Sequence, residues 1–144
     1  MSTDRPYLGI CFGAQVLATA FGGRVDQLIA PFSGYVPLDT SADAPAALSG
    51  PWTVWHNDGI TAPTGAEITG SLDHADLAFR THRAWGLQPH VEVTADSLER
   101  MVIALGATPQ EYGPIVDAVR ADADANAARA RALLDAFWTE VNAR

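Results

Sequence analysis

The feature of this sequence that most constrains its fold is a cysteine set between two glycines, Gly9-Ile10-Cys11-Phe12-Gly13. An apolar run over 7–10 precedes it and a helix-like stretch follows, so we predict a strand over 7–10 and a helix over 13–21. Small residues allow a sharp turn that leaves the central side chain exposed at the helix N-terminus. There the helix dipole and free N–H groups favour a thiolate. A lone cysteine is usually a small buried apolar residue, but this setting favours a nucleophile.

A second pattern lies far along the chain, in Gly86-Leu87-Gln88-Pro89-His90-Val91-Glu92-Val93-Thr94. His90 and Glu92 are two residues apart, so in an extended segment their side chains leave on the same side. A carboxylate beside an imidazole fixes its tautomer and raises its basicity, which is the orienting role in a catalytic triad. A cysteine with a distant histidine is a pattern of covalent catalysis. We therefore predict Cys11 as nucleophile, His90 as base and Glu92 as the orienting carboxylate.

Both motifs resemble those of class I (triad-type) glutamine amidotransferases, most closely GMP-synthetase-like domains that stand as separate chains. Residues 7–15 resemble the nucleophile motif, and residues 86–94 resemble the Gln-Phe-His-Pro-Glu motif with Pro89 and Val91 substituted. The segments at 34–35 and 55–58 resemble intermediate family segments, so the resemblance runs from Pro6 to about Leu105. It implies an α/β fold: a three-layer, flavodoxin-like, mostly parallel sheet with flanking helices and a long C-terminal helix. We expect one domain over 1–144, with a C-terminal helical region at about 109–142.

The resemblance also implies a reaction. Cys11 would attack the side-chain amide of glutamine and form a glutamyl thioester, and the ammonia released would serve a partner synthetase. The N–H of Phe12 would stabilise the oxyanion. The substrate-binding positions that the family implies are Gln15, Gly9 and Gly13.

Two further segments invite a functional reading. His56 and Asp58 lie where the family places backbone contacts to the substrate amino acid, although histidines in such turns are usually just exposed. His74 and His82 are predicted to be surface residues. No zinc or calcium spacing is present, so we expect neither a metal nor another cofactor.

Family domains carry a further segment before the elbow, which supplies the first strands and a glycine-rich turn with one oxyanion N–H. Here residues 1–5 lead almost directly into the elbow strand. We therefore expect one unpaired side on this strand, exposed apolar surface beside it, and a shortened chain or one part of an assembly such as a homo-oligomer. Two alternatives stay open: a related hydrolase of other γ-glutamyl amides, and an inactive truncated domain that acts in assembly or binding.

Composition indicates the number of domains, the kinds of partner and the cellular compartment to expect. The chain of 144 residues is 48% hydrophobic and 18% charged, as expected for one globular domain. Its net charge of −8 argues against binding nucleic acid or an anionic membrane. A single cysteine cannot form an internal disulfide, and no apolar run approaches the roughly 20 residues needed to cross a bilayer. We expect a cytoplasmic protein.

The remaining elements follow from local patterns. We predict a loop over 39–51, a strand over 53–55 with a turn over 56–59, and paired strands over 77–80 and 84–88. Thr94 is a predicted N-cap for a helix ending near Leu105, and Thr108 to Glu111 has capping-box spacing. Apolar residues at helical spacing from Pro114 onward predict one long amphipathic helix that packs on the core of the chain itself.

Overall fold

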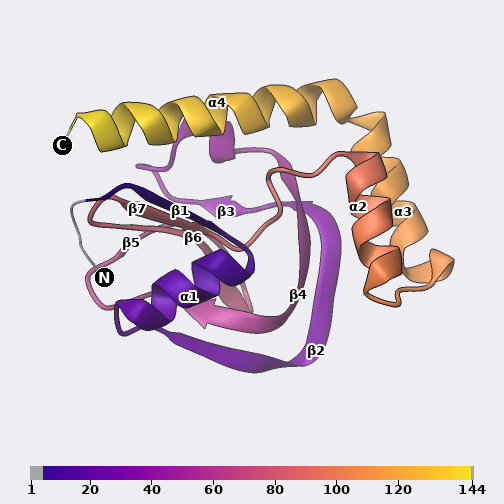
Figure 1. The fold of residues 1–144 in the computed structure, drawn as a ribbon, viewed down its shortest axis with the longest axis horizontal. Helices are drawn as coiled ribbons and strands as arrows, with labels where there is room; N and C mark the ends of the chain where they lie inside the picture. The colour runs from indigo at the N-terminus through magenta and orange to yellow at the C-terminus, as the bar shows by residue number, and fades with distance from the viewer. Residues whose placement is uncertain (1–4, 144) are drawn as a thin grey trace.

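The computed structural model describes residues 5–143 and arranges its strands in a five-stranded sheet and a two-stranded ribbon (Figure 1). In spatial order the sheet contains β1 (Tyr7–Ile10), β7 (Ala84–Leu87), β6 (Ala75–Thr81), β5 (Glu67–Leu72) and β3 (Asp39–Thr40). The ribbon pairs β2 (Arg24–Pro37) with β4 (Pro51–Thr61). A short 3-10 helix, η1 (Ala46–Leu48), lies in the loop between β3 and β4.

Strand directions in the sheet follow from the connections. β5, β6 and β7 are joined by short turns, which force antiparallel pairing. β1 and β7 are far apart in sequence and pair in parallel. The predicted α/β fold with flanking helices is confirmed, and within residues 5–143 the sheet is mixed, with β1/β7 as its parallel pair.

Helices cover both faces of the sheet, giving the three layers seen in Figure 1. α1 (Phe12–Ala20) packs on one face through a cluster that includes Phe79 and Ala84. α4 (Ala123–Asn142) lies on the other, where Phe137 meets Trp85 edge-on at 5.6 Å between ring centroids. Successive residues of β7 thus serve opposite faces, as the strand period requires.

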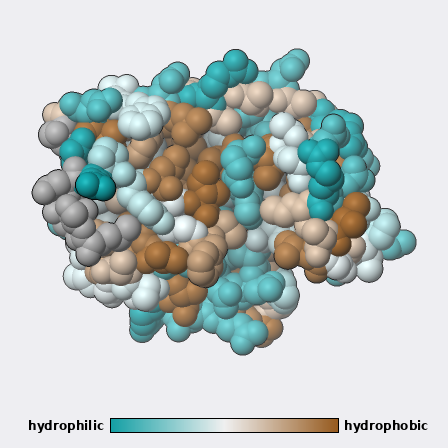
Figure 2. All heavy atoms as spheres, viewed as in Figure 1, coloured by the Kyte–Doolittle hydropathy of each residue, from teal (hydrophilic) through white to brown (hydrophobic). Residues whose placement is uncertain are grey.

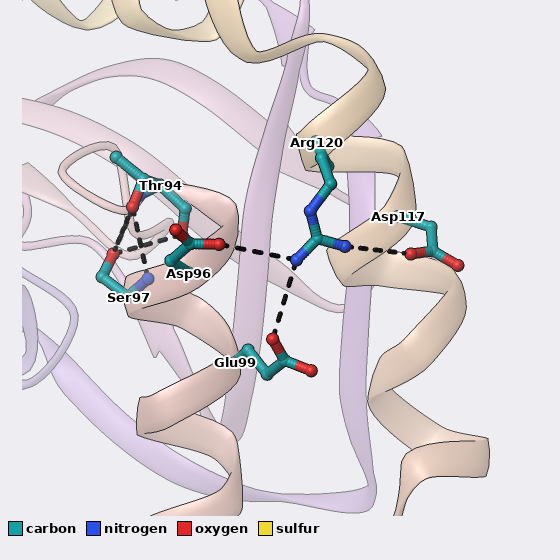
Figure 3. A network of polar contacts seen from close by, with 6 residues as sticks. All are labelled: Thr94, Asp96, Ser97, Glu99, Asp117 and Arg120. Carbon is teal, nitrogen blue, oxygen red and sulfur yellow. Dashed lines mark hydrogen bonds and ion pairs between the residues drawn. The ribbon is translucent and has the colours of Figure 1, made fainter.

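Two shorter helices, α2 (Ala95–Ala104) and α3 (Pro109–Ala121), pack together beside the sheet (Figure 1). Arg120 of α3 lies 3.6 Å from the carboxylates of Asp96 and Glu99 of α2, and 3.2 Å from that of Asp117 in its own helix. Figure 3 shows how these side chains point toward one another. Both predicted caps are confirmed: the Thr94 side chain accepts from the N–H of Ser97 at 3.2 Å, and Thr108 forms a capping box with Glu111. Well-capped ends fix where the chain enters each helix.

The prediction of one long helix from Pro114 is wrong at Asp122, where the backbone leaves helical geometry and separates α3 from α4. The Asp122 carboxylate accepts hydrogen bonds from Tyr35 Oη at 2.8 Å and from Arg129 at 2.7 Å. Aspartate favours helix ends over helix interiors, and these bonds hold it there. The predicted long C-terminal helix is confirmed in α4, which has 20 residues.

The predicted turn over 56–59 is also wrong. These residues continue β4, because β2 pairs with them over a long antiparallel register that includes Gln27 opposite Asp58. Long-range pairing therefore overrides a turn-like composition.

β1 pairs only with β7 among the described residues, so its other edge is unpaired, as predicted. Figure 2 shows apolar surface below α4, over β1. A groove of about 400 Å³ lies there, lined by residues that include Ile10, Val91, Val93 and Leu134. No helix within residues 5–143 is long and apolar enough to cross a membrane.

Candidate active site

The turn between β1 and α1 is built around close backbone contact. Gly9 lies opposite Gly86 in the parallel β1/β7 register, and the N–H of Cys11 donates to the carbonyl of Leu87 at 2.8 Å. A Cβ on Gly9 would stand 2.5 Å from the carbonyl oxygen of Gly13, closer than atoms approach. Glycine at position 9 is therefore what lets the helix start directly over the strand end.

Cys11 occupies the apex of this turn with φ 49° and ψ −108°, a backbone conformation that non-glycine residues rarely adopt. Its carbonyl accepts from the N–H groups of Ala14 and Gln15 and so starts α1. Phe12 is the first helical residue, so its N–H belongs to the helix-terminal donors that have no intrahelical partner. The strained apex and the free donors sit together, as in sites that stabilise an anion.

His90 follows the end of β7, the strand beside β1, and the topology thus brings it to Cys11. Its backbone N–H donates to the carbonyl of Thr53 on β4 at 2.8 Å. Its Nδ1 lies 2.8 Å from a carboxylate oxygen of Glu92. With Nδ1–H donated to Glu92, the Nε2 atom is left for the thiol of Cys11.

Electrostatics favour a charged His90. Burial of the imidazole lowers its pKa, but hydrogen bonding and charge interaction with Cys11 and Glu92 outweigh that effect and raise the pKa to about 9. At neutral pH the imidazolium therefore faces the sulfur, the arrangement that favours a thiolate–imidazolium pair.

The segment that carries Glu92 is held from α4 by Asn126, which sequence reasoning missed. Asn126 is buried, and its Nδ2 donates to the carbonyl of Val93 at 3.0 Å. The Thr94 cap fixes the next residue. Nothing in the local sequence signals this contact, because α4 begins 30 residues further along the chain.

A cavity of about 460 Å³ opens beside the cysteine, and Cys11, Gln15, Trp55, His56, Asp58 and Glu111 are among its lining residues. Gln15 thus faces the space where a small ligand would meet the sulfur. Gly9 and Gly13, the two glycines predicted to bind substrate, are not among the lining residues; Gly9 is needed for the close packing of the turn.

His56, which lines this cavity, is held by two polar contacts. Its Nδ1 lies 2.7 Å from the carbonyl oxygen of Asp58, so Nδ1–H donates there, and its Nε2 lies 3.1 Å from Nε2 of His74. Burial lowers the pKa of His56, so it is neutral at neutral pH. His74 was predicted to be a surface residue; it is half-buried against His56 and Phe32 because the turn between β5 and β6 folds over β4. His82 is exposed, as predicted.

Gln88 is a second residue that sequence reasoning missed. It is fully buried, its Nε2 lies 3.5 Å from Cys11 Sγ, and its Oε1 lies 3.4 Å from Nε2 of Gln15. The available signal was its place in the 86–94 segment, two residues before His90. Among residues 5–143, no three His, Cys, Asp or Glu side chains are grouped to hold a metal ion.

Comparison with known proteins shows which family this chain resembles. A sequence model described as "Glutamine amidotransferase class-I" matches residues 1–107. The chain is similar to the glutamine-hydrolysing GMP synthase of Thermobifida fusca, with 34% identity over 70% of this chain and 21% of that protein. It is also similar to the one from Legionella pneumophila, with 31% identity over 78% of this chain and 25% of that protein. The chain therefore spans about a fifth to a quarter of the length of these relatives.

Solved structures agree on the fold. A glutamine amidotransferase from Thermotoga maritima superposes with a TM-score of 0.81 at 22% identity, over 93% of this chain and 63% of that one. One from Methylobacillus flagellatus gives 0.79 at 21% identity, over 96% and 64%. At these levels of sequence identity, the structural similarity supports the fold alone.

Proposed function

Since the chain belongs to the class I glutamine amidotransferase family, we propose that it hydrolyses the side-chain amide of glutamine with Cys11, His90 and Glu92 as a catalytic triad. The observation that carries this proposal is the strained elbow at Cys11 beside an imidazole whose other nitrogen lies 2.8 Å from Glu92. Nucleophile, acid–base group and orienting carboxylate stand in the order that covalent catalysis requires.

The first half of the reaction breaks the amide. The Cys11 thiolate attacks the side-chain carbonyl carbon of glutamine, and the oxyanion that forms accepts a hydrogen bond from the N–H of Phe12. His90 begins as an imidazolium, consistent with its raised pKa of about 9, and gives its proton to the departing nitrogen. Ammonia leaves, and a glutamyl thioester remains on Cys11.

The second half releases the acid. His90 is now neutral and takes a proton from a water molecule that attacks the thioester carbonyl. The carbon–sulfur bond breaks, glutamate departs and the thiolate–imidazolium pair is restored. Glu92 keeps Nδ1 protonated throughout and holds the ring in one orientation.

Glutamine binds in the cavity beside the sulfur, whose volume of about 460 Å³ is in the range of small-molecule sites. Gln15 lines it from α1, while His56 and Asp58 line it from β4. These groups offer amide, imidazole and backbone partners for the amino and carboxylate groups of an amino acid.

The ammonia is proposed to pass to a synthetase on a partner chain or on another part of a longer chain. Supporting this, the curated relatives are named as glutamine-hydrolysing GMP synthases, and this chain matches only a fifth to a quarter of each. We further propose that residues 1–144 act as one amidotransferase-like domain, with the region at about 109–142 as its helical part.

The test is glutamate release from glutamine by the purified chain, with Cys11→Ala as the matched control. We expect release that disappears in Cys11→Ala and falls about 10²- to 10⁴-fold in His90→Gln, since general acid–base catalysis contributes that much. Release that persists in Cys11→Ala contradicts the proposal. Faster cleavage of a γ-glutamyl anilide than of glutamine would instead favour a γ-glutamyl hydrolase.

A further inference from the structure

A buried amide chain links the sulfur to the cavity. Gln88 directly follows β7; its backbone N–H donates to the carbonyl of Leu77 at 2.7 Å, and its side chain is fully buried. Its carboxamide spans Cys11 Sγ on one side, at 3.5 Å, and Gln15 Nε2 on the other, at 3.4 Å. A buried amide with two polar neighbours is held in one place, because losing either hydrogen bond there is costly.

The hydrogen bonds of this amide give the direction in which it faces. Nε2 of Gln88 donates to Cys11 Sγ, and the sulfur accepts this bond. The amide oxygen of Gln88 then faces Gln15 and accepts a hydrogen bond from Nε2 of Gln15. Gln15 lies in α1 and lines the cavity, so its amide oxygen remains available there as a hydrogen-bond acceptor.

We propose that Gln88 is a positioning residue for the reaction: it donates a hydrogen bond to the Cys11 thiolate and, through its amide, fixes the orientation of Gln15. Gln15 thereby offers a carbonyl oxygen, which selects a ligand that donates hydrogen bonds, such as the ammonium or carboxamide N–H of an amino acid amide. This inference rests on the proposed function for the ligand, but the Gln88–Cys11 contact does not depend on it.

The contact itself is tested by alkylation of Cys11 with iodoacetamide. The chain has one cysteine, so the rate reports on this sulfur alone. Gln88→Met keeps the buried volume and removes the donor, and we expect it to slow alkylation at neutral pH about tenfold and to move the pH profile upward. Gln110→Leu, at an exposed position of α3, is the control for loss of a glutamine and should leave the rate unchanged. A folded Gln88→Met that alkylates at the parent rate across the profile overturns the proposal.

The relay through Gln15 is tested separately, with a change that leaves the buried position intact. Gln15→Glu replaces the donor that faces Gln88 by an acceptor, so the Gln88 amide should turn and withdraw its N–H from the sulfur. We expect slower alkylation in the parent background and no further slowing when Gln15→Glu is added to Gln88→Met. Equal slowing in both backgrounds would mean a through-space charge effect and would refute the relay.

The substrate arm uses glutamine kinetics. Gln15→Leu should raise KM for glutamine with little change in alkylation, while Gln88→Met should lower kcat. If no variant hydrolyses glutamine but the alkylation results hold, the proposed function fails and the positioning role of Gln88 stands. If glutamine is hydrolysed but the alkylation rate is the same in Gln88→Met as in the parent, the proposed function stands and the positioning role of Gln88 fails.

Discussion

The sharpest prediction concerns the glycine beneath the elbow. In Gly9→Ala the new Cβ would stand 2.5 Å from the carbonyl oxygen of Gly13 and 2.8 Å from the nitrogen of Ala14, both backbone atoms that cannot rotate away. The start of α1 must move off β1, and overpacking of this kind costs about 3 kcal/mol at the upper end of its range. For a chain of this size that lowers Tm by about 10 °C.

Gly13→Ala is the matched control. Its Cβ would have its nearest neighbour, Tyr7 Oη, at 3.5 Å, an ordinary contact, and alanine is favoured over glycine within a helix by about 0.5–1 kcal/mol. We expect Tm to stay level or rise by about 2–3 °C. Thermal unfolding followed by circular dichroism measures both. A Gly9→Ala protein as stable as the parent would refute the close-packed elbow.

Three further predictions use the same unfolding assay. Cys11→Gly should be about 1–2 kcal/mol more stable than Cys11→Ala, because only glycine relieves the strain at φ 49°; equal stability would contradict that strain. Asn126→Ala should lower the free energy of unfolding by about 1–3 kcal/mol, since the Val93 carbonyl is left unsatisfied. A decrease below about 0.5 kcal/mol, as is usual for surface substitutions, would contradict the anchoring. The pKa of His90 is raised from 6.5 to about 9, so its contribution to stability is complete below about pH 6.5 and is lost as pH rises through about 9; His90→Gln should lack this decline.

The elbow and the capped helices could be predicted because their signals are local. Gly9, Cys11 and Gly13 lie within five residues, and Thr94 needs only the next turn of chain to act as a cap. The pairing of His90 with Glu92 was predicted from a spacing of two in an extended segment; the two side chains do meet, but Val91 and Glu92 lie in a turn. That they act with Cys11 was predicted from the pattern of a cysteine with a distant histidine and supported by the family resemblance, since the parallel β1/β7 pairing joins positions far apart in sequence.

What the sequence did not reveal depends on distant partners. The polar residues 56–59 suggest a turn by composition, but β2 pairs with them and extends β4. The helical periodicity after Pro114 continues through Asp122, where bonds to Tyr35 and Arg129 break the helix. Gln88 and Asn126 gain their contacts from elements far along the chain: the 86–94 motif marks the position of Gln88 without revealing its contacts, and nothing local marks Asn126.

The central claim is that glutamine is opened by covalent attack of Cys11. Intact-mass spectrometry after rapid quenching, on parent and Glu92→Gln protein mixed with glutamine, tests it most directly. The account predicts a glutamyl adduct on the parent chain that is absent in Cys11→Ala and longer-lived in Glu92→Gln, where His90 is less well oriented to activate water. Glutamate formation by a folded Cys11→Ala protein would contradict it, and so would turnover by the parent chain with no adduct at any time.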